Sequence, residues 1–235
     1  MVRRYDVDRK SSAVVFVFNG SAWHDGPSLP LAVNHPGAAV IAGAVYVAGG
    51  FTRGSATNRV FVLARGTGHW RELESMRRPR GTLALLALVG RLYAIGGRDG
   101  STQVGLPEIY DPGTGPWRDL SAMPAPRNHV AGYVNGTLVC VAGGRTPDTS
   151  TAIDCFNPTT ATWHTVASLP TATSGAAATR LGGVTIVAGG EPAGETQLVG
   201  VVQIHGAGTW TTEPMLVPRH GTAFAHGANV FATDF

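Results

Sequence analysis

Five tryptophans recur at an almost constant interval along this chain of 235 residues. They lie 47, 47, 46 and 47 residues apart, at Trp23, Trp70, Trp117, Trp163 and Trp210. Four Gly-Gly pairs follow the same period, at 49–50, 96–97, 143–144 and 189–190. A period that covers the whole chain indicates a small structural unit that buries its apolar residues by packing against its neighbours. It predicts a single domain over 1–235, with repeats at about 33–78, 79–125, 126–171 and 172–217.

The apolar pattern inside one repeat predicts four short strands. In the second repeat, residues 81–89 form a nearly continuous apolar run, which is typical of a buried strand. Gly90-Arg91 then suits a tight turn, and residues 92–95 form a second strand that ends at a glycine pair. A third strand is predicted at 108–110 and a fourth from Trp117 onward. With 32 Gly and 15 Pro in the chain, helices are disfavoured, so each repeat is predicted to be a four-stranded antiparallel sheet.

These features resemble the kelch repeat family of β-propellers. The similarity is carried by the glycine pairs, the tryptophans, segments such as 45–50 and 92–97, and the third-strand aromatics Phe16, Tyr110 and Phe156, from which Leu63 and Gln203 depart. WD40 propellers have a similar period, but no tryptophan of this chain is followed by aspartate. The resemblance implies an all-β, kelch-type propeller in which the glycines and tryptophans are structural.

The two ends of the chain are predicted to complete one blade between them. Residues 14–18 and Trp23 fit a third and a fourth strand, and residues 220–235 fit a first and a second. A closing blade from 13–30 and 218–235 would give five blades and remove the open sheet edges. The alternative is that the chain is a piece of a longer ring, for example of six blades.

Polar residues are expected at one end of the central channel. In a four-stranded meander, the loop before the first strand and the loop after the second emerge on the same face. Both loops are rich in arginine, asparagine and histidine. The predicted binding residues are Asn34, His35, Arg53, Arg80, Arg98, Arg127, Asn128, His129, Arg145, Arg219 and His220. The alternative for each arginine is that it binds backbone carbonyls and holds the inner strands in register.

Converging guanidinium groups favour an anionic or hydrogen-bonding partner. The resemblance implies protein or peptide binding on this face, so we expect a non-catalytic domain that recognises a protein or an acidic peptide. The alternative is an anionic sugar, because kelch-like propellers include sialic-acid mutarotases and copper-radical galactose oxidases. A deep pocket with His129 or Glu191 near an arginine would favour the small molecule, and a broad shallow ring of loops would favour the protein. Charge reversal of Arg80 and Arg127 together is expected to abolish binding and leave the fold intact.

Other functional classes find little support in the sequence. The net charge is only +3, so no nucleic-acid partner is expected. No catalytic motif or cofactor fingerprint is present, and no metal site is expected, because nothing in the spacing of His35, His129 and His220 imposes one. Residues 1–12 are polar and no segment could span a bilayer, so we expect a cytoplasmic monomer without membrane contact. Cys140 and Cys155 are expected to be buried thiols; a disulfide between them is the alternative if the turn is symmetric about 147–148.

Overall fold

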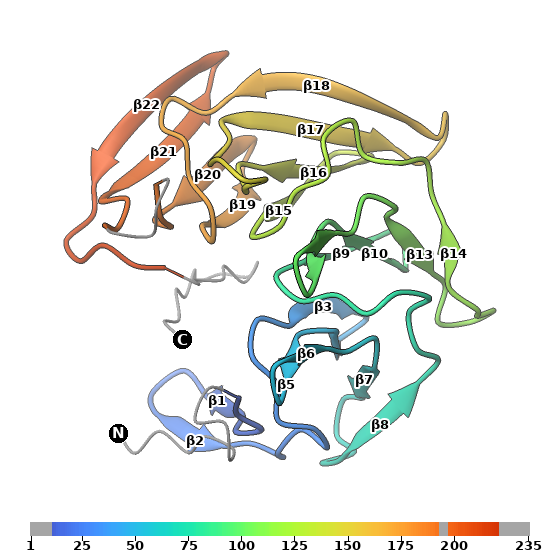
Figure 1. The fold of residues 1–235 in the computed structure, drawn as a ribbon. Coiled ribbons are helices and arrows are strands. Elements are labelled where there is room, and N and C mark those ends of the chain that lie inside the picture. Colours follow the sequence, from blue (N-terminus) through green and yellow to red (C-terminus); the bar gives the residue numbers. More distant parts are fainter. Residues whose placement is uncertain (1–10, 193–196, 221–235) are drawn as a thin grey trace.

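The computed structural model describes residues 11–192 and 197–220, and these form β-strands with no helix among them. Figure 1 shows four sheets and an N-terminal hairpin arranged side by side around a common centre. One four-stranded antiparallel sheet lies in each of the four repeats. The prediction of an all-β, kelch-type propeller built from four-stranded sheets is confirmed.

The first two repeats have the predicted meander topology. The first contains β3 (Gly37–Ile41), β4 (Ala44–Ala48), β7 (Val60–Leu63) and β8 (Trp70–Leu73). The second contains β9 (Ala84–Leu88), β10 (Arg91–Ile95), β13 (Glu108–Tyr110) and β14 (Arg118–Asp119). Each also carries a short hairpin that the sequence analysis did not predict, β5 (Phe51–Thr52) with β6 (Ser55–Ala56) and β11 (Arg98–Asp99) with β12 (Thr102–Gln103).

The last two repeats continue the same order of strands. The third contains β15 (Ala131–Asn135), β16 (Leu138–Ala142), β17 (Ala152–Asn157) and β18 (Thr162–Ser168). The fourth contains β19 (Ala177–Leu181), β20 (Val184–Ala188), β21 (Val201–Gly206) and β22 (Thr209–Pro214). The apolar core lies between successive sheets, in clusters that combine residues of neighbouring repeats.

The N-terminal hairpin matches the strands expected for a closing blade. β1 (Phe16–Phe18) pairs with β2 (Trp23–Asp25), and Ser12 forms an isolated bridge with Val33. The partner strands expected at 218–235 fall almost entirely outside the described residues. Closure of the ring by the two ends, and the count of five blades, therefore stay predictions.

The glycine pairs clasp each sheet to the next one. In Gly49, Gly96, Gly143 and Gly189, φ lies between 62° and 70°, a region that side chains rarely adopt. A Cβ at these positions would lie only 2.3–2.6 Å from a carbonyl oxygen of the following repeat. The second glycine of each pair donates its N–H to that same carbonyl, at 2.7–3.0 Å. Only glycine allows the two backbones to approach this closely.

The tryptophans fasten neighbouring sheets at their outer strands, as predicted. The indole N–H groups of Trp70, Trp117 and Trp163 donate to the carbonyls of Pro27, Glu74 and Ser121 in the preceding repeat, at 2.7–2.9 Å. These acceptors are themselves 47 residues apart. Each of these three tryptophans thus covers the boundary between two sheets and satisfies its polar atom there.

The register of two hairpins corrects the predicted third-strand aromatics. Trp23 packs on Phe18 and Trp210 on His205, with ring centroids 5.2 and 4.9 Å apart. Phe16 and Gln203, which were chosen from their distance to the tryptophan in the sequence, are therefore not the residues opposite it. In these two hairpins the tryptophan pairs with the residue five positions before it, whereas Trp70 and Trp163 pair with residues seven positions before them, so Trp23 and Trp210 lie nearer the turn.

Cys140 and Cys155 form a disulfide, which corrects the expectation of two buried thiols. The residues face each other on β16 and β17, with their Cα atoms 4.0 Å apart. The loop between them is symmetric about 147–148, the condition on which the alternative depended. Among the residues that the structure describes, no helix has the length and apolar character needed to cross a membrane.

Candidate functional site

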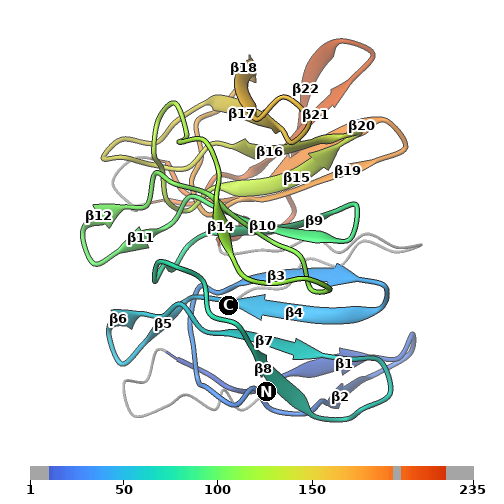
Figure 2. The same ribbon diagram turned by 90° about the vertical axis from the view of Figure 1, so that its right-hand side faces the viewer.

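Two sets of loops meet on one face of the propeller. The residue after each glycine pair forms an isolated bridge with the loop that precedes the first strand of the same repeat. The four bridges are Asn34–Phe51, Gly81–Arg98, Asn128–Arg145 and Ser174–Glu191. Figure 2 shows hairpins β5–β6 and β11–β12 projecting on the same side of the molecule. We call this side, defined by the four bridges and the two hairpins, the channel mouth.

A series of three backbone hydrogen bonds links four successive sheets at this level. The N–H of Thr82 donates to the carbonyl of His35, that of His129 to Thr82, and that of Gly175 to His129, at 2.8–2.9 Å. All four residues have left-handed φ angles between 51° and 67°. This conformation is unusual for residues with side chains and is found at sites that the surrounding structure holds firmly. The repeat therefore brings one residue from each of four sheets to the same level.

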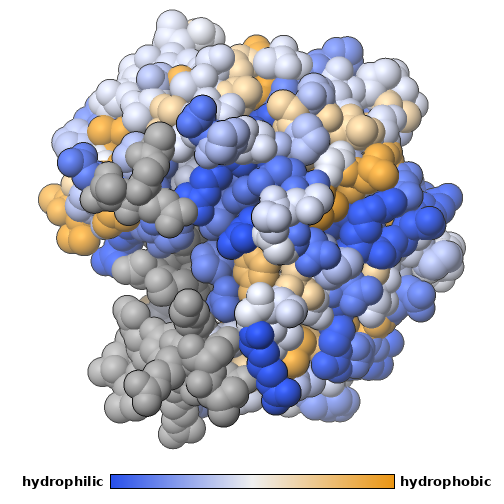
Figure 3. All heavy atoms as spheres, in the orientation of Figure 1, coloured by the Kyte–Doolittle hydropathy of each residue, from blue (hydrophilic) through white to orange (hydrophobic). Residues whose placement is uncertain are grey.

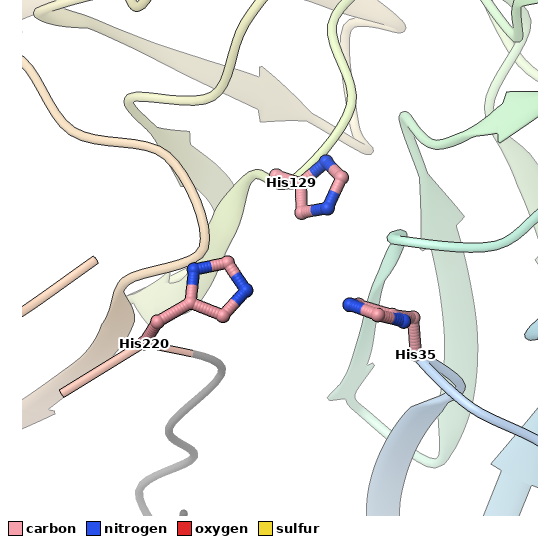
Figure 4. Close-up of side chains that lie close together, drawn as sticks. All are labelled: His35, His129 and His220. Carbon is pink, nitrogen blue, oxygen red and sulfur yellow. The ribbon is translucent and has the colours of Figure 1, made fainter. Parts of the chain in front are cut away.

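Three histidines converge at this level, as Figure 4 shows. The ring centroids of His35, His129 and His220 are 5.5–6.4 Å apart. His220 lies one place earlier in its repeat than His35 and His129 do in theirs. It reaches the cluster because Gly175 has no side chain: a Cβ on Gly175 would lie 2.6 Å from the imidazole of His220.

The histidines line a small recess of about 100 Å³, together with Thr82, Gly175 and the apolar residues Pro36, Leu83, Val130 and Ala176. Pockets for drug-sized ligands are usually about 300–1,000 Å³. The recess is therefore large enough for a side chain or a few water molecules and too small to enclose a sugar. Figure 3 shows that hydrophilic residues dominate the middle and right of this face.

His129 is the buried member of the cluster. Desolvation, followed by the positive charge of Arg145, lowers the pKa of His129 from 6.5 to about 2. Its imidazole is therefore neutral at physiological pH. Nη2 of Arg145 lies 3.4 Å from Nε2 of this ring, and Nη1 lies 3.4 Å from a carboxylate oxygen of Glu191.

Arg80 and Arg127 do not lie at the channel mouth, which corrects their assignment as binding residues. Both side chains are buried, with relative exposures of 0% and 2%. Arg80 donates to the carboxylate of Glu108 at 2.6 Å and to the carbonyl of Gly96 at 3.1 Å. Arg127 donates to Asp154 at 2.7 Å and to Gly143 at 2.8 Å. For these two arginines the alternative, a structural role, is the one observed.

The fourth repeat fulfils the same structural task without charge. Thr173 takes the place of Arg80 and Arg127, and its hydroxyl donates to the carbonyl of Gly189 at 2.7 Å. Gln203 takes the place of Glu108 and Asp154, and its amide bonds both backbone groups of Thr171. The ion pairs are therefore one version of a repeated latch between the third strand and the loop before the first.

The other predicted residues remain at or near the channel mouth. Arg98 is half-buried, lies over the ring of Phe51 at 4.9 Å, and donates to the carbonyl of Gly100. Arg53 is exposed at the turn between β5 and β6. Arg219 is half-buried beside His220. The asparagines support the histidines: the side-chain oxygens of Asn34 and Asn128 contact Nδ1 of His35 and His129.

Sequence reasoning left Phe51, Thr82 and Gly175 out of the site. Thr82 and Gly175 lie 12 residues after their tryptophans, as His35 and His129 do, so the repeat register could have found them. Phe51 directly follows a glycine pair, as Arg98 and Arg145 do. Its contact with Arg98, which belongs to the next repeat, depends on how two blades are packed and has no signal in the sequence.

Comparisons with known proteins agree with this architecture. The kelch motif model matches residues 33–77, 79–124 and 125–170, together more than half of the chain. Among solved structures, the one described as "Structure of YjhT" superposes with a TM-score of 0.80 over 91% of this chain and 81% of that chain, at 15% sequence identity. At that identity the likeness shows the fold alone. A search of curated protein sequences gave no match.

Proposed function

We propose that this chain, which belongs to the kelch-motif family of β-propellers, is a recognition domain that binds a carboxylate-bearing protein or peptide segment at the channel mouth. The observation that supports this most is the small recess with Arg145 beside it and with Arg53, Arg98 and Arg219 on the surrounding loops. A guanidinium group binds carboxylates with paired, charge-assisted hydrogen bonds.

The size of the recess favours a partner that inserts one side chain. At about 100 Å³ it admits a carboxylate side chain, while the rest of an acidic peptide would lie across the loops and hairpins around it. Loops held by a rigid scaffold are the usual place for such recognition. The four bridges and the series of backbone hydrogen bonds provide that scaffold here, so little ordering is needed on binding.

The proposal is tested by binding to an array of peptides that differ in acidic, neutral and basic character. We expect the wild-type protein to bind a subset of acidic peptides, with an affinity that falls as salt rises. Arg98→Glu together with Arg145→Glu should remove that binding. Arg65→Glu together with Arg118→Glu is the matched control, because these exposed arginines lie in a strand-connecting turn and on outer strand β14. Equal binding by both double variants would contradict the proposal.

A second candidate is a small carboxylated ligand such as an acidic monosaccharide. It is favoured by one observation, the direct contact of Arg145 with both His129 and Glu191, which places an acid–base pair beside a cation. The small volume of the recess is unfavourable for a ligand of this size. Saturation-transfer NMR with sialic acid and with uronic acids would show ligand signals only if this second function applies.

A further inference from the structure

The histidine cluster has the arrangement of a ligand set. Each of the three imidazoles offers one nitrogen, and these three atoms lie within 4.8 Å of one another. Figure 4 shows a nitrogen of each ring facing the space between them. A point therefore exists no more than about 2.8 Å (4.8 Å divided by √3) from all three nitrogens. Zn–N bonds are about 2.0–2.1 Å long, so rotations that move each nitrogen by less than about 1 Å would complete a coordination shell.

Each imidazole also has an oxygen beside its other nitrogen. Nδ1 of His35 lies 2.8 Å from the amide oxygen of Asn34, and Nδ1 of His129 contacts the amide oxygen of Asn128. Nδ1 of His220 lies 2.8 Å from a carboxylate oxygen of Glu191, close enough for an ion pair but without the angle of a hydrogen bond. An acceptor at Nδ1 favours the tautomer with hydrogen on that atom, which leaves the lone pair on Nε2. Metal-binding histidines almost always have such a partner on the second nitrogen.

We propose that His35, His129 and His220 bind one divalent transition-metal ion, with Zn²⁺ as the expected ion. This departs from the sequence-based expectation of no metal, which depended on sequence spacing alone. Imidazole ligands suit Zn²⁺, Cu²⁺ and Ni²⁺ and do not suit Mg²⁺ or Ca²⁺. Three protein ligands leave a further position open on the side of the recess, as in zinc sites that also bind water or another ligand.

The charges around the cluster set the affinity. Arg145 opposes a cation, since one of its nitrogens lies 3.4 Å from Nε2 of His129, and it has to move aside when the metal binds. Glu191 favours the cation through its contact with His220. Arg145→Gln is therefore expected to strengthen metal binding several-fold. If the histidines were only packed together, this substitution would leave metal affinity unchanged.

The test uses untagged protein, treated with a chelator and then titrated with Zn²⁺ against a chromophoric competitor. The wild-type protein should bind one equivalent. His35→Ala and His220→Ala should each weaken binding by more than about 100-fold, since loss of an outer-shell partner alone costs about 10–100-fold. His164→Ala is the matched control, because that histidine is exposed on outer strand β18, and it should bind as the wild type does. Zn²⁺ should also raise the Tm of the wild type and of His164→Ala, and not that of His35→Ala or His220→Ala.

His35 is exposed, so its alanine variant is expected to fold, and equal Tm values in chelator would show that it does. Asn34→Ala gives an independent reading, because it keeps all three ligands and removes one orienting oxygen. It should weaken Zn²⁺ binding by about 10–100-fold. The proposal would be overturned if folded His35→Ala or His220→Ala bound Zn²⁺ as tightly as the wild type, or if the wild type bound none.

Discussion

Arginine has two separate tasks in this chain, and its position in the repeat decides which. Arg80 and Arg127 begin repeats and latch the third strand to the loop before the first. Burial lowers the pKa of the Arg80 guanidinium, and Glu108 acts in the opposite direction, which is typical of a desolvated ion pair. Arg98 and Arg145 follow glycine pairs and lie at the channel mouth. The same side chain is buried in the first loop and partly exposed in the second.

Removal of a latch arginine should therefore damage the fold. Arg127→Met leaves Asp154 buried, and Thr165 is its one remaining side-chain donor among the described residues. We expect a loss of about 3–5 kcal/mol in the free energy of unfolding, as for other buried ion pairs that lose one member. Denaturation with urea would measure it. Arg118→Met on the exposed β14 is the control and should change stability by less than about 0.5 kcal/mol. Equal midpoints for both variants would show that the latch contributes little.

Gly143 and Gly136 have nearly the same φ angle but different surroundings. Substituting each one therefore measures the cost of backbone strain separately from the cost of close packing. Gly143 has φ of 62° and a carbonyl oxygen 2.3 Å from where a Cβ would lie; Gly136 has φ of 60° and open space there. Gly136→Ala should cost only the left-handed strain, about 1–2 kcal/mol. Gly143→Ala should cost about 1–3 kcal/mol more, because the next blade has to move away. Urea denaturation of both variants checks this. If Gly143→Ala lost less free energy of unfolding than Gly136→Ala, close packing of this glycine against the next blade would be contradicted.

At the scale of strands, the repeat period predicted most of what is observed. The third strand of the second repeat was expected at 108–110 and is found there as β13. The errors arose where the period is broken. In the first and last hairpins the tryptophan lies nearer the turn and pairs with Phe18 or His205, and counting from the tryptophan cannot detect such a shift. Hairpins β5–β6 and β11–β12 are only two residues per strand, too short to leave an alternating pattern.

The disulfide between β16 and β17 is also a property of strand register. It closes a loop of 15 residues, which corresponds to about 3 kcal/mol of stabilisation in the loop-entropy model. We expect reduction to lower the free energy of unfolding by about that amount in the wild type. Cys140→Ala together with Cys155→Ala should be insensitive to reductant. Alkylation of both cysteines in denatured, unreduced protein, followed by mass spectrometry, would contradict the bond.

At the scale of the whole molecule, the packing of blades around an axis brings distant residues together. The sequence analysis predicted one polar face and named most of its residues, because the loop positions follow from the repeat. It could not distinguish Arg127 from Arg145, since burial depends on partners such as Asp154 that are distant in sequence. It also missed how Gly175 makes room for His220, which is a contact between two repeats.

The disulfide bears on where the protein works. Disulfides persist in secreted and periplasmic proteins and are rare in the cytosol. Cys140–Cys155 therefore argues against the cytoplasmic location expected from the polar residues 1–12, and an oxidising compartment is the better prediction. Detection of the intact bond in protein taken directly from its source would test it.

Hydrogen exchange with and without an acidic peptide that binds tests the central claim most directly, because it locates the binding face without any mutation. We predict slower exchange in 51–56, 98–103 and 145–151, the segments that form the channel mouth. Turns at the opposite ends of the inner strands, at 42–43, 89–90, 136–137 and 182–183, should be unchanged. Protection confined to those turns or to the outer strands β8, β14, β18 and β22 would contradict recognition at the channel mouth.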